Sequence, residues 1–452
     1  MEYFDEIKRL QEYDKKFIWH PFTQMKEWEE ETPIIISEAK DCFLKEITGK
    51  WYLDGVSSLW VNIHGHRRKE INDAIKAQLD KVSHSTLLGL ANVPSIELAK
   101  RIADITPKGL NRIFYSDNGS TGVEVALKMA FQYWRYKGDT KRKTFISLNN
   151  AYHGDTLGAV SVGGVNIFHE AFGPLLFKTY RAPSPYCYRC ELGLEKESCK
   201  TACLDKMDDI LNEHKEEIAG VILEPLVQAA GGMIVAPEGY LRGVRDICKK
   251  HDVLLILDEV ATGFGRTGRM FACEHEDVVP DIICLSKGLT GGYLPLALTV
   301  CTDEIYDAFL GEFKDLKTFF HGHSYTGNQL GCAAGLACLD IFEKDETLKN
   351  LQPKIKLFDN WLDEVMNLDH VGDSRAWGLM GAVEIVKDKG TKEEYPWEEK
   401  MGWQVVYRAR DKGLFLRPLG NVIVIMPPLA ISEENLTRML EIISESIKEI
   451  TG

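Results

Sequence analysis

The chain has 452 residues, 44% of them hydrophobic, so it can bury a large core and is longer than one average domain. Its formal net charge of -14 and its isoelectric point near 5.4 argue against nucleic acid or an anionic membrane as a partner, because an acidic protein repels both. No apolar run approaches the roughly 20 residues that span a bilayer, and the first residues lack the pattern of a signal peptide, which predicts a cytoplasmic protein with reduced thiols.

Short apolar runs alternate with helical patterns through the middle of the chain. This alternation predicts a largely parallel sheet covered by helices on both faces. The expected strands are residues 112–115, 144–148, 220–223, 253–257, 281–285 and 297–300.

The pattern changes from residue 348 onward. A charged helical stretch is followed by short strand-like segments at residues 381–386 and 422–426, and by an amphipathic helix that begins at Ser432. No linker splits the chain, so we expect an α/β protein whose two domains share one body. The predicted boundaries are residues 61–334 for a large domain and residues 1–60 with 335–452 for a smaller α+β domain.

Five of the expected strands stop at a chemically useful side chain. The carboxyl ends of parallel strands lie along one edge of the sheet, where sites in open α/β folds are built. The residues that follow these strands are Gly119 and Ser120 in a turn, Tyr152, Glu224, Asp258 and Lys287. We therefore expect an anion-binding turn, an aromatic ring, two carboxylates and an amine to meet at one edge.

Each of these residues also has an ordinary structural role when it is considered alone. Asp258 could cap a turn after its strand, Lys287 could be a solvated lysine, and the glycine-serine turn could be a simple helix N-cap. Tyr152 could be a core aromatic and Glu224 a salt-bridge carboxylate. Only the combination carries a functional hypothesis.

Together these residues match the requirements of pyridoxal 5'-phosphate. A phosphate binds well at a helix N-terminus, here at Gly119 and Ser120. Lys287 provides an amine that can form a Schiff base, and Asp258 provides a carboxylate that keeps a pyridine ring protonated. The ring of Tyr152 could stack on the cofactor.

The stretches LILDEVATGFGRTG (residues 255–268) and CLSKGLTGG (residues 284–292) resemble the cofactor signature of the class III, fold-type I aminotransferases, and the resemblance runs over nearly the whole chain. It implies a Schiff-base and proton-shuttle role for Lys287 and a partnership of Asp258 with the pyridine nitrogen. It also implies a phosphate cradle at the glycine-serine turn, a stacking role for Tyr152 and a cofactor contact for Glu224.

A second set of implied roles concerns the assembly. Gly322, His323 and Ser324 match a loop that, in such enzymes, reaches across the dimer interface to the cofactor of the neighbouring subunit. The resemblance therefore implies an obligate homodimer.

Five further segments are similar to the members of the family that aminate 8-amino-7-oxononanoate in biotin synthesis: residues 19–28, 116–128, 150–156, 319–328 and 416–428. The resemblance implies a ping-pong reaction through pyridoxamine phosphate. It also implies that Arg417 holds the substrate carboxylate. The other substrate residues that it implies are Phe22, Leu59, Trp60, Tyr152 and Gly322.

Two departures from this pattern leave the amino donor open between S-adenosylmethionine and lysine. Phe22 stands where many members have tyrosine, and Leu59 precedes Trp60 where they have a pair of tryptophans. An aminotransferase acting on ornithine, 4-aminobutyrate or lysine is the nearest alternative.

Four cysteines occur within the polar segment PYCYRCELGLEKESCKTAC. Cys187, Cys190, Cys199 and Cys203 could hold a zinc ion, but the second spacing is loose and related enzymes need no metal, so no metal ligand is assigned. Free thiols and a disulfide are the alternatives. A non-enzymatic scaffold stapled by zinc is the competing hypothesis from a different class of function.

Overall fold

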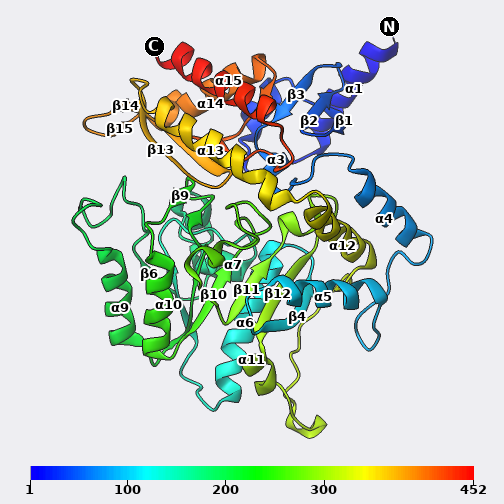
Figure 1. The fold of residues 1–452 in the computed structure, drawn as a ribbon, viewed down its shortest axis with the longest axis vertical. Helices are drawn as coiled ribbons and strands as arrows, with labels where there is room; N and C mark the ends of the chain where they lie inside the picture. The colour runs from blue at the N-terminus through cyan, green and yellow to red at the C-terminus, as the bar shows by residue number, and fades with distance from the viewer. Residues whose placement is uncertain (1) are drawn as a thin grey trace.

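Seven strands of the computed structural model, which describes residues 2–452, form one sheet in the order β4-β12-β11-β10-β7-β5-β6 (Figure 1). Strand β12 runs antiparallel to both neighbours, and the other pairs in this sheet are parallel. The prediction of a largely parallel sheet is confirmed. The bounds are β4 Leu110–Ser116, β5 Thr144–Leu148, β6 Tyr180–Ala182, β7 Ile218–Leu223, β10 Leu254–Asp258, β11 Ile282–Leu285 and β12 Ala297–Thr302.

All six expected strands belong to this sheet, and their bounds differ from the prediction by only one or two residues. The seventh strand, β6, was not predicted. It has three residues and only its last one is fully buried, so it carries too little apolar pattern to be recognised.

Both faces of the sheet are covered, because successive side chains of a strand point to opposite faces. Ile222 and Ile256 pack with the apolar side of α6 (Gly119–Tyr136). Val221 and Leu255, their neighbours in sequence, belong to the other core cluster, which includes residues of α10 (Tyr240–His251). This double burial explains the continuous apolar runs of the strands.

The other helices connect strands or pack around them. Their bounds are α1 Glu2–Phe17, α2 Met25–Glu30, α3 Ser57–Trp60, α4 Lys69–Leu79, α5 Val93–Ile105, α7 Leu157–Val162, α8 Asn166–His169, α9 Ala202–His214, α11 Asp303–Ala308, α12 Gln329–Lys344, α13 Thr347–Val365, α14 Met401–Asp411 and α15 Glu433–Thr451. Ser432 caps α15 by accepting the N–H of Asn435, so the predicted start of the last helix is confirmed.

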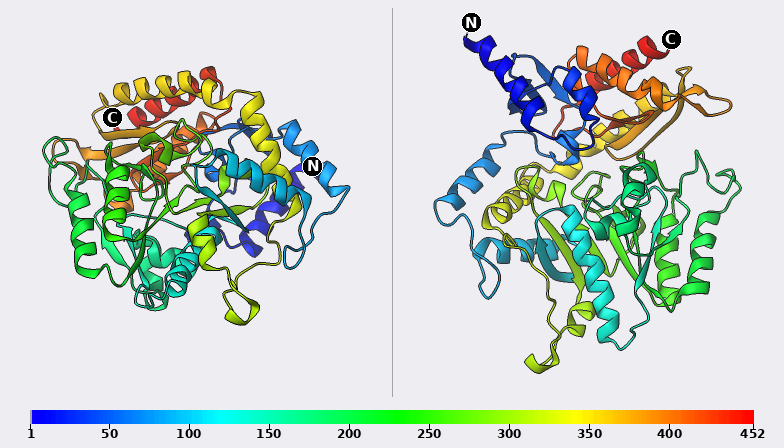
Figure 2. Two further views of the ribbon diagram at one scale, coloured as in Figure 1. Left: turned by 60° about the horizontal axis from the view of Figure 1, so that its bottom comes forward. Right: turned by 180° about the vertical axis from the view of Figure 1, so that it is seen from behind.

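The two ends of the chain lie on the same side of the seven-stranded sheet (Figures 1 and 2). There are three smaller sheets. One contains β1 (Ile36–Lys40), β2 (Phe43–Glu46), β3 (Trp51–Asp54) and β16 (Leu414–Phe415), and another contains β13 (Val371–Trp377), β14 (Met380–Asp388), β15 (Glu393–Glu394), β17 (Pro418–Leu419) and β18 (Val422–Ile425). The third is the pair β8 (Val227–Gln228) and β9 (Ile234–Val235). The parallel pairing of β3 with β16 joins the two ends of the chain in one sheet. The boundaries placed at residues 61 and 335 stay a prediction.

Across residues 2–452, no helix combines the length and the apolar composition that crossing a membrane requires.

Candidate active site

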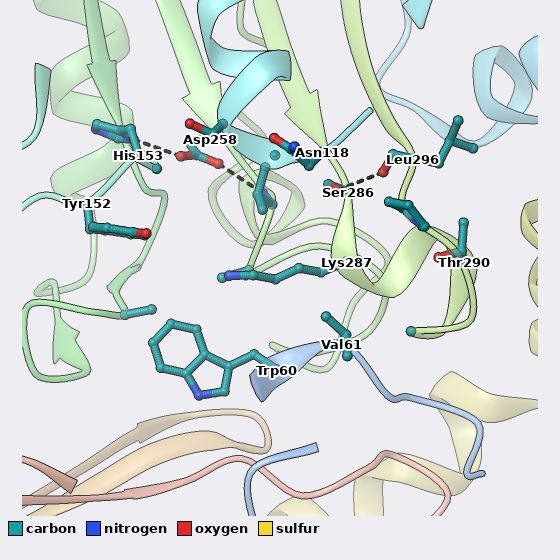
Figure 3. A pocket seen from close by; sticks show the side chains of 18 of the residues that line it. Trp60, Val61, Asn118, Tyr152, His153, Asp258, Ser286, Lys287, Thr290 and Leu296 are labelled. Carbon is teal, nitrogen blue, oxygen red and sulfur yellow. Dashed lines mark hydrogen bonds and ion pairs between the residues drawn. The ribbon is translucent and has the colours of Figure 1, made fainter. Parts of the chain in front are cut away.

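A cavity of about 640 Å³ opens at the carboxyl ends of β5, β7, β10 and β11 (Figure 3). Its volume lies in the range of small-molecule sites. Seven of the residues predicted from the sequence line it: Trp60, Gly119, Ser120, Tyr152, Glu224, Asp258 and Lys287. The predicted convergence at one sheet edge is therefore observed.

Lys287 follows the end of β11 and extends across the cavity toward the ring of Trp60 (Figure 3). Its backbone has a φ of 43°, a left-handed conformation that is strained for a lysine and that occurs mainly at functional sites. The Nζ atom lies 4.8 Å from the centroid of the Trp60 ring. Burial lowers the pKa of the Lys287 amine, Arg266 lowers it further, and the carboxylates of Asp258 and Glu224 act in the opposite direction. The amine is thereby brought closer to its nucleophilic, neutral form.

Asp258 ends β10 and is held by two hydrogen bonds. Its Oδ2 lies 2.7 Å from Nδ1 of His153, and its Oδ1 accepts the N–H of Val260 at 3.0 Å. Because the carboxylate is an acceptor, the imidazole donates through Nδ1. The side chain of His153 is buried, and its Nε2 has no hydrogen-bond partner within residues 2–452. The imidazole therefore orients the carboxylate from a dry pocket.

The N-terminus of α6 forms another part of the cavity wall. Asn118 caps it by accepting the N–H of Thr121 at 3.0 Å, which leaves the first N–H groups of the helix free to meet an anion. Ser120 is fixed beside them, since its Oγ donates to Oγ1 of Thr156 at 3.0 Å and accepts the N–H of the same residue at 2.9 Å.

Two glycines bring the backbone close around this helix end. A Cβ on Gly119 would come within 2.6 Å of Val260. Gly154 has a φ of 116°, and a Cβ there would lie 2.4 Å from Oγ of Ser120. Larger residues at these two positions would therefore displace Val260 and Ser120 at the N-terminus of α6, where an anion could bind.

Glu224 holds the loop that carries Tyr152. Its Oε2 accepts the N–H of Tyr152 at 3.1 Å, and its Oε1 accepts the N–H of Ala229 at 2.9 Å. Burial raises the pKa of Glu224 to about 7, with Asp258 acting in the same direction and the two N–H groups and His153 opposing it. The carboxyl group of Glu224 thus holds two backbone N–H groups in place at the cavity wall.

The phenol of Tyr152 is held in its neutral form. Its hydroxyl donates to Oδ2 of Asp155 at 2.7 Å, and burial, together with this hydrogen bond, raises the pKa of Tyr152. The ring borders the cavity beside Asp258 and Trp60 (Figure 3).

These groups fit pyridoxal 5'-phosphate. The helix end with its two close-packed glycines suits a phosphate, the carboxylate of Asp258 suits a protonated ring nitrogen, and the buried amine of Lys287 suits a carbonyl carbon. The chain thus has a matching group for each polar part of this cofactor.

Six predicted residues do not line the cavity within this chain: Phe22, Leu59, Gly322, His323, Ser324 and Arg417. Nη2 of Arg417 donates to the carbonyl of Phe22 at 3.1 Å, so these two predicted substrate residues are neighbours. Leu59 is 56% exposed, although Trp60 next to it points into the cavity. Nδ1 of His323 lies 2.7 Å from Oδ2 of Asp117, next to the cap of α6.

The main residue that sequence reasoning did not assign is His153. Its signal was its place between Tyr152 and Gly154, directly after a strand that ends at the site. Asn118 and Thr156 were missed in the same way, since both are neighbours of assigned residues. Ser286 directly precedes Lys287 and has the same signal, whereas nothing local in the sequence marks Tyr293, which also borders the cavity.

Comparisons with known proteins agree with this geometry. The chain matches the model of the family described as aminotransferase class-III over residues 24–447. It is 56% identical to the adenosylmethionine-8-amino-7-oxononanoate aminotransferase of Geobacter sulfurreducens over 448 residues, which cover 99% of each protein.

Two crystal structures extend the comparison. That of the adenosylmethionine-8-amino-7-oxononanoate aminotransferase of Methanocaldococcus jannaschii has a TM-score of 0.94 and 52% identity, covering 98% of this chain and 99% of its own. A PLP-bound amine transaminase from an uncultivated Pseudomonas species has a TM-score of 0.91 and 34% identity, covering 96% and 99% of the two chains. With its lysine, its carboxylate and its phosphate cradle on one sheet edge, the chain belongs to the class III aminotransferases and uses pyridoxal 5'-phosphate as its cofactor.

Proposed function

We propose that this enzyme converts 8-amino-7-oxononanoate to 7,8-diaminononanoate in biotin synthesis, with S-adenosylmethionine as the amino donor. Amino transfer is supported by the Lys287 amine, which lies in a cavity that also contains Asp258 and the α6 N-terminus. The choice of substrates is supported by relatives that bear this activity in their names and align over nearly the full chain at 51–56% identity.

The transfer takes place in two halves: the donor leaves its amino group on the enzyme before the keto acid takes it up. The chemistry supplied by bound pyridoxal 5'-phosphate is an aldehyde that receives the amino group and a ring that withdraws electrons from the reacting carbon. Lys287, as a free amine, would accept a proton from the donor carbon at its Nζ atom and would later release the proton from the same atom. Asp258 would keep the ring nitrogen of the cofactor protonated, and His153 holds Asp258 in place.

The neighbouring groups bind and orient. The first turn of α6, with Gly119 and Ser120, holds the phosphate. Tyr152 would border the cofactor ring, and Glu224 fixes the backbone of Tyr152. Trp60 closes the cavity on the side of Lys287 and limits the access of water.

Arg417 is proposed to hold the carboxylate of the keto acid. Its guanidinium uses one nitrogen on the Phe22 carbonyl and stacks 5.7 Å from the ring of Trp403. The planar fork can pair with a carboxylate through two parallel hydrogen bonds. A substrate bound there would reach toward Lys287 with its distal ketone.

The enzyme is further proposed to act as a homodimer in the cytoplasm. Gly322, His323 and Ser324 border no part of this chain's cavity, which suits a loop that completes the site of a second subunit. Apolar side chains around this loop are exposed: Leu88 by 71% and Phe320 by 73%. Such exposure is typical of surfaces that pair with another protein.

The visible spectrum of the enzyme loaded with pyridoxal 5'-phosphate tests the donor. S-adenosylmethionine should bleach the yellow absorbance, L-lysine should not, and 8-amino-7-oxononanoate should then restore the colour. Bleaching by lysine alone would show that lysine is the donor and would leave the proposed acceptor unchanged. Bleaching by neither, together with activity on ornithine or 4-aminobutyrate, would contradict the proposed substrates.

Mixed dimers test the shared site. One subunit would carry Lys287→Ala, and the other would carry a bulky substitution at Gly322. Each homodimer should be inactive, whereas the mixture should regain activity, because one of its two sites has both intact groups. An inactive mixture would contradict the shared site, and a monomer in analytical ultracentrifugation would contradict the dimer.

A further inference from the structure

Four of the eleven cysteines gather outside the active site. Cys187, Cys190, Cys199 and Cys203 line the same small cavity, whose volume is about 20 Å³. These four are only partly buried, whereas the other seven are buried. All four thiols are free. The space between them suits a single ion or one water molecule.

Both cysteine pairs of the sequence, Cys187 with Cys190 and Cys199 with Cys203, border this one cavity. The two halves of the sequence motif, CxxC and CxxxC, therefore meet in space.

The backbone around these cysteines turns back sharply. Between Cys199 and Cys203, both Lys200 and Thr201 have a left-handed conformation, with φ of 49° and 59°. Two consecutive left-handed residues other than glycine are costly unless other interactions hold them. The turn places Cys203 in the first turn of α9.

A buried hydroxyl nearby lacks an acceptor. Tyr240 is 1% exposed, and its phenol has no hydrogen-bond partner in the described part of the chain. It begins α10, which packs against α9, the helix that contains Cys203. A phenol O–H needs an acceptor, and a thiolate sulfur can serve as one.

We propose that Cys187, Cys190, Cys199 and Cys203 form a tetrathiolate site for one Zn²⁺. Zinc prefers four sulfur ligands in a tetrahedron at about 2.3 Å, and closed sites of this kind are structural. Binding is an exchange without redox chemistry: four Zn–S bonds form, and the four S–H protons leave to solvent.

The thiols must turn to complete the site. As the side chains lie, no three His, Cys, Asp or Glu residues of the described range 2–452 are already grouped to hold a metal ion. The thiols border a common cavity, so rotation about the Cα–Cβ bonds is the movement needed.

The segment is anchored toward the active site. Glu191, next to Cys190, accepts hydrogen bonds from Nδ2 of Asn149 at 2.6 Å and from the N–H of Ser184 at 3.1 Å. Asn149 directly follows β5 and begins the stretch that leads to Tyr152. On the other side, Nε of Arg189 donates to Oε1 of Glu384 in β14 at 2.6 Å. Zinc would therefore stiffen a loop that supports the wall of the cofactor cavity.

Metal analysis of the holoenzyme tests the proposal. The protein would be purified under reducing conditions, without an affinity tag and without added metal, and its zinc measured by mass spectrometry. We expect about one zinc per chain. The double variant Cys187→Ser with Cys190→Ser should lose the zinc and melt at a lower temperature while it still binds pyridoxal 5'-phosphate. Cys332→Ala, which removes a buried thiol elsewhere, should keep the zinc.

Wild-type protein supplies a test that does not depend on the folding of the double variant. Exchange with Co²⁺ should produce sulfur-to-cobalt charge-transfer absorption and the visible bands of a tetrahedral cobalt site. Two outcomes would overturn the proposal: protein that takes up neither zinc nor cobalt, or a disulfide among these cysteines as the state isolated under reducing conditions.

Discussion

Nδ1 of His153 lies 2.7 Å from Oδ2 of Asp258, and both side chains are buried at the floor of the cofactor cavity. This contact joins the segment after β5 to the end of β10 across 105 residues of sequence. It gives His153 a positioning role, since the imidazole acts on the cofactor through the carboxylate.

Replacing His153 should therefore reduce the rate without removing the cofactor. His153→Leu deletes a hydrogen bond to a charged group, which is worth about 1.5–3 kcal/mol, so kcat should fall by ~10–150-fold. His153→Asn keeps an N–H donor near the Nδ1 position and should recover most of the rate. Steady-state kinetics and the pH profile of kcat measure the effect. Equal rates for the Leu and Asn variants would show that the hydrogen bond does not contribute to kcat.

Lys287→Ala should abolish transamination. The variant loses both the amine that binds the cofactor carbon and the group that moves the proton, and proton transfer alone contributes ~10²–10⁴-fold. Circular dichroism should remain unchanged, because the Nζ atom lies in a cavity rather than in the packed core. An active Lys287→Ala enzyme would disprove the assignment.

The rate of cofactor uptake by the apoenzyme should depend on pH through Lys287. Burial lowers the pKa of this amine, so its neutral, reactive form appears at lower pH than for an ordinary lysine. Asp258 opposes this effect, and Asp258→Asn should therefore move the acidic limb of the uptake profile to still lower pH. Stopped-flow absorbance measures the uptake. An acidic limb at the pH expected for an ordinary, exposed lysine would contradict the lowered pKa of Lys287.

Asp258→Asn should also lose most of the turnover, because a neutral amide cannot hold the ring proton by charge. We expect a loss of about 10²–10⁴-fold in kcat with measurable cofactor still bound. A near-normal kcat would remove Asp258 from the mechanism.

Arg417→Ala should raise KM for the keto acid far more than KM for the donor. Hydrogen bonds between charged groups are worth about 1.5–3 kcal/mol, which corresponds to ~10–150-fold in KM. Arg417→Lys is the matched control, since it keeps the charge but not the planar fork. Equal effects on both substrates would place Arg417 outside the carboxylate site.

Arg375 should contribute strongly to stability. Its guanidinium is buried and donates to Oε2 of Glu384 at 2.9 Å, to Asp373 and to the carbonyl of Gly232 at 2.7 Å. Arg375→Met leaves buried carboxylates without this cation and should cost ~3–5 kcal/mol. The midpoint of urea unfolding measures the loss. Adding Glu384→Gln should recover part of it, and a midpoint equal to that of the wild type would contradict the argument.

Much of the site could be predicted because it depends on a local rule. Asp258 and Lys287 each follow a buried apolar strand, and parallel strands must end on the same edge of their sheet. The start of α6 was recognisable in the same way, from Gly119 and Ser120 ahead of an apolar helical repeat. The strand β6 escaped detection because three residues carry almost no periodicity.

The remaining features depend on partners far away in the sequence. Nothing local predicts that Arg417 contacts the carbonyl of Phe22, or that Trp60 lies beside the amine of Lys287. Trp60 reaches the cavity because Ser57 to Trp60 form a left-handed turn, with φ between 49° and 70°. Such a conformation costs energy locally and is maintained only by surrounding contacts.

The sequence by itself therefore determined the chemistry of the site: an amine, a carboxylate and a helix end at the carboxyl edge of a parallel sheet. Only the tertiary structure decided how these groups are oriented, through contacts such as those of His153 with Asp258 and of Glu224 with the Tyr152 backbone. The physical reason is that side-chain periodicity is a property of neighbouring residues, whereas orientation and pKa arise from burial and from groups that folding brings together.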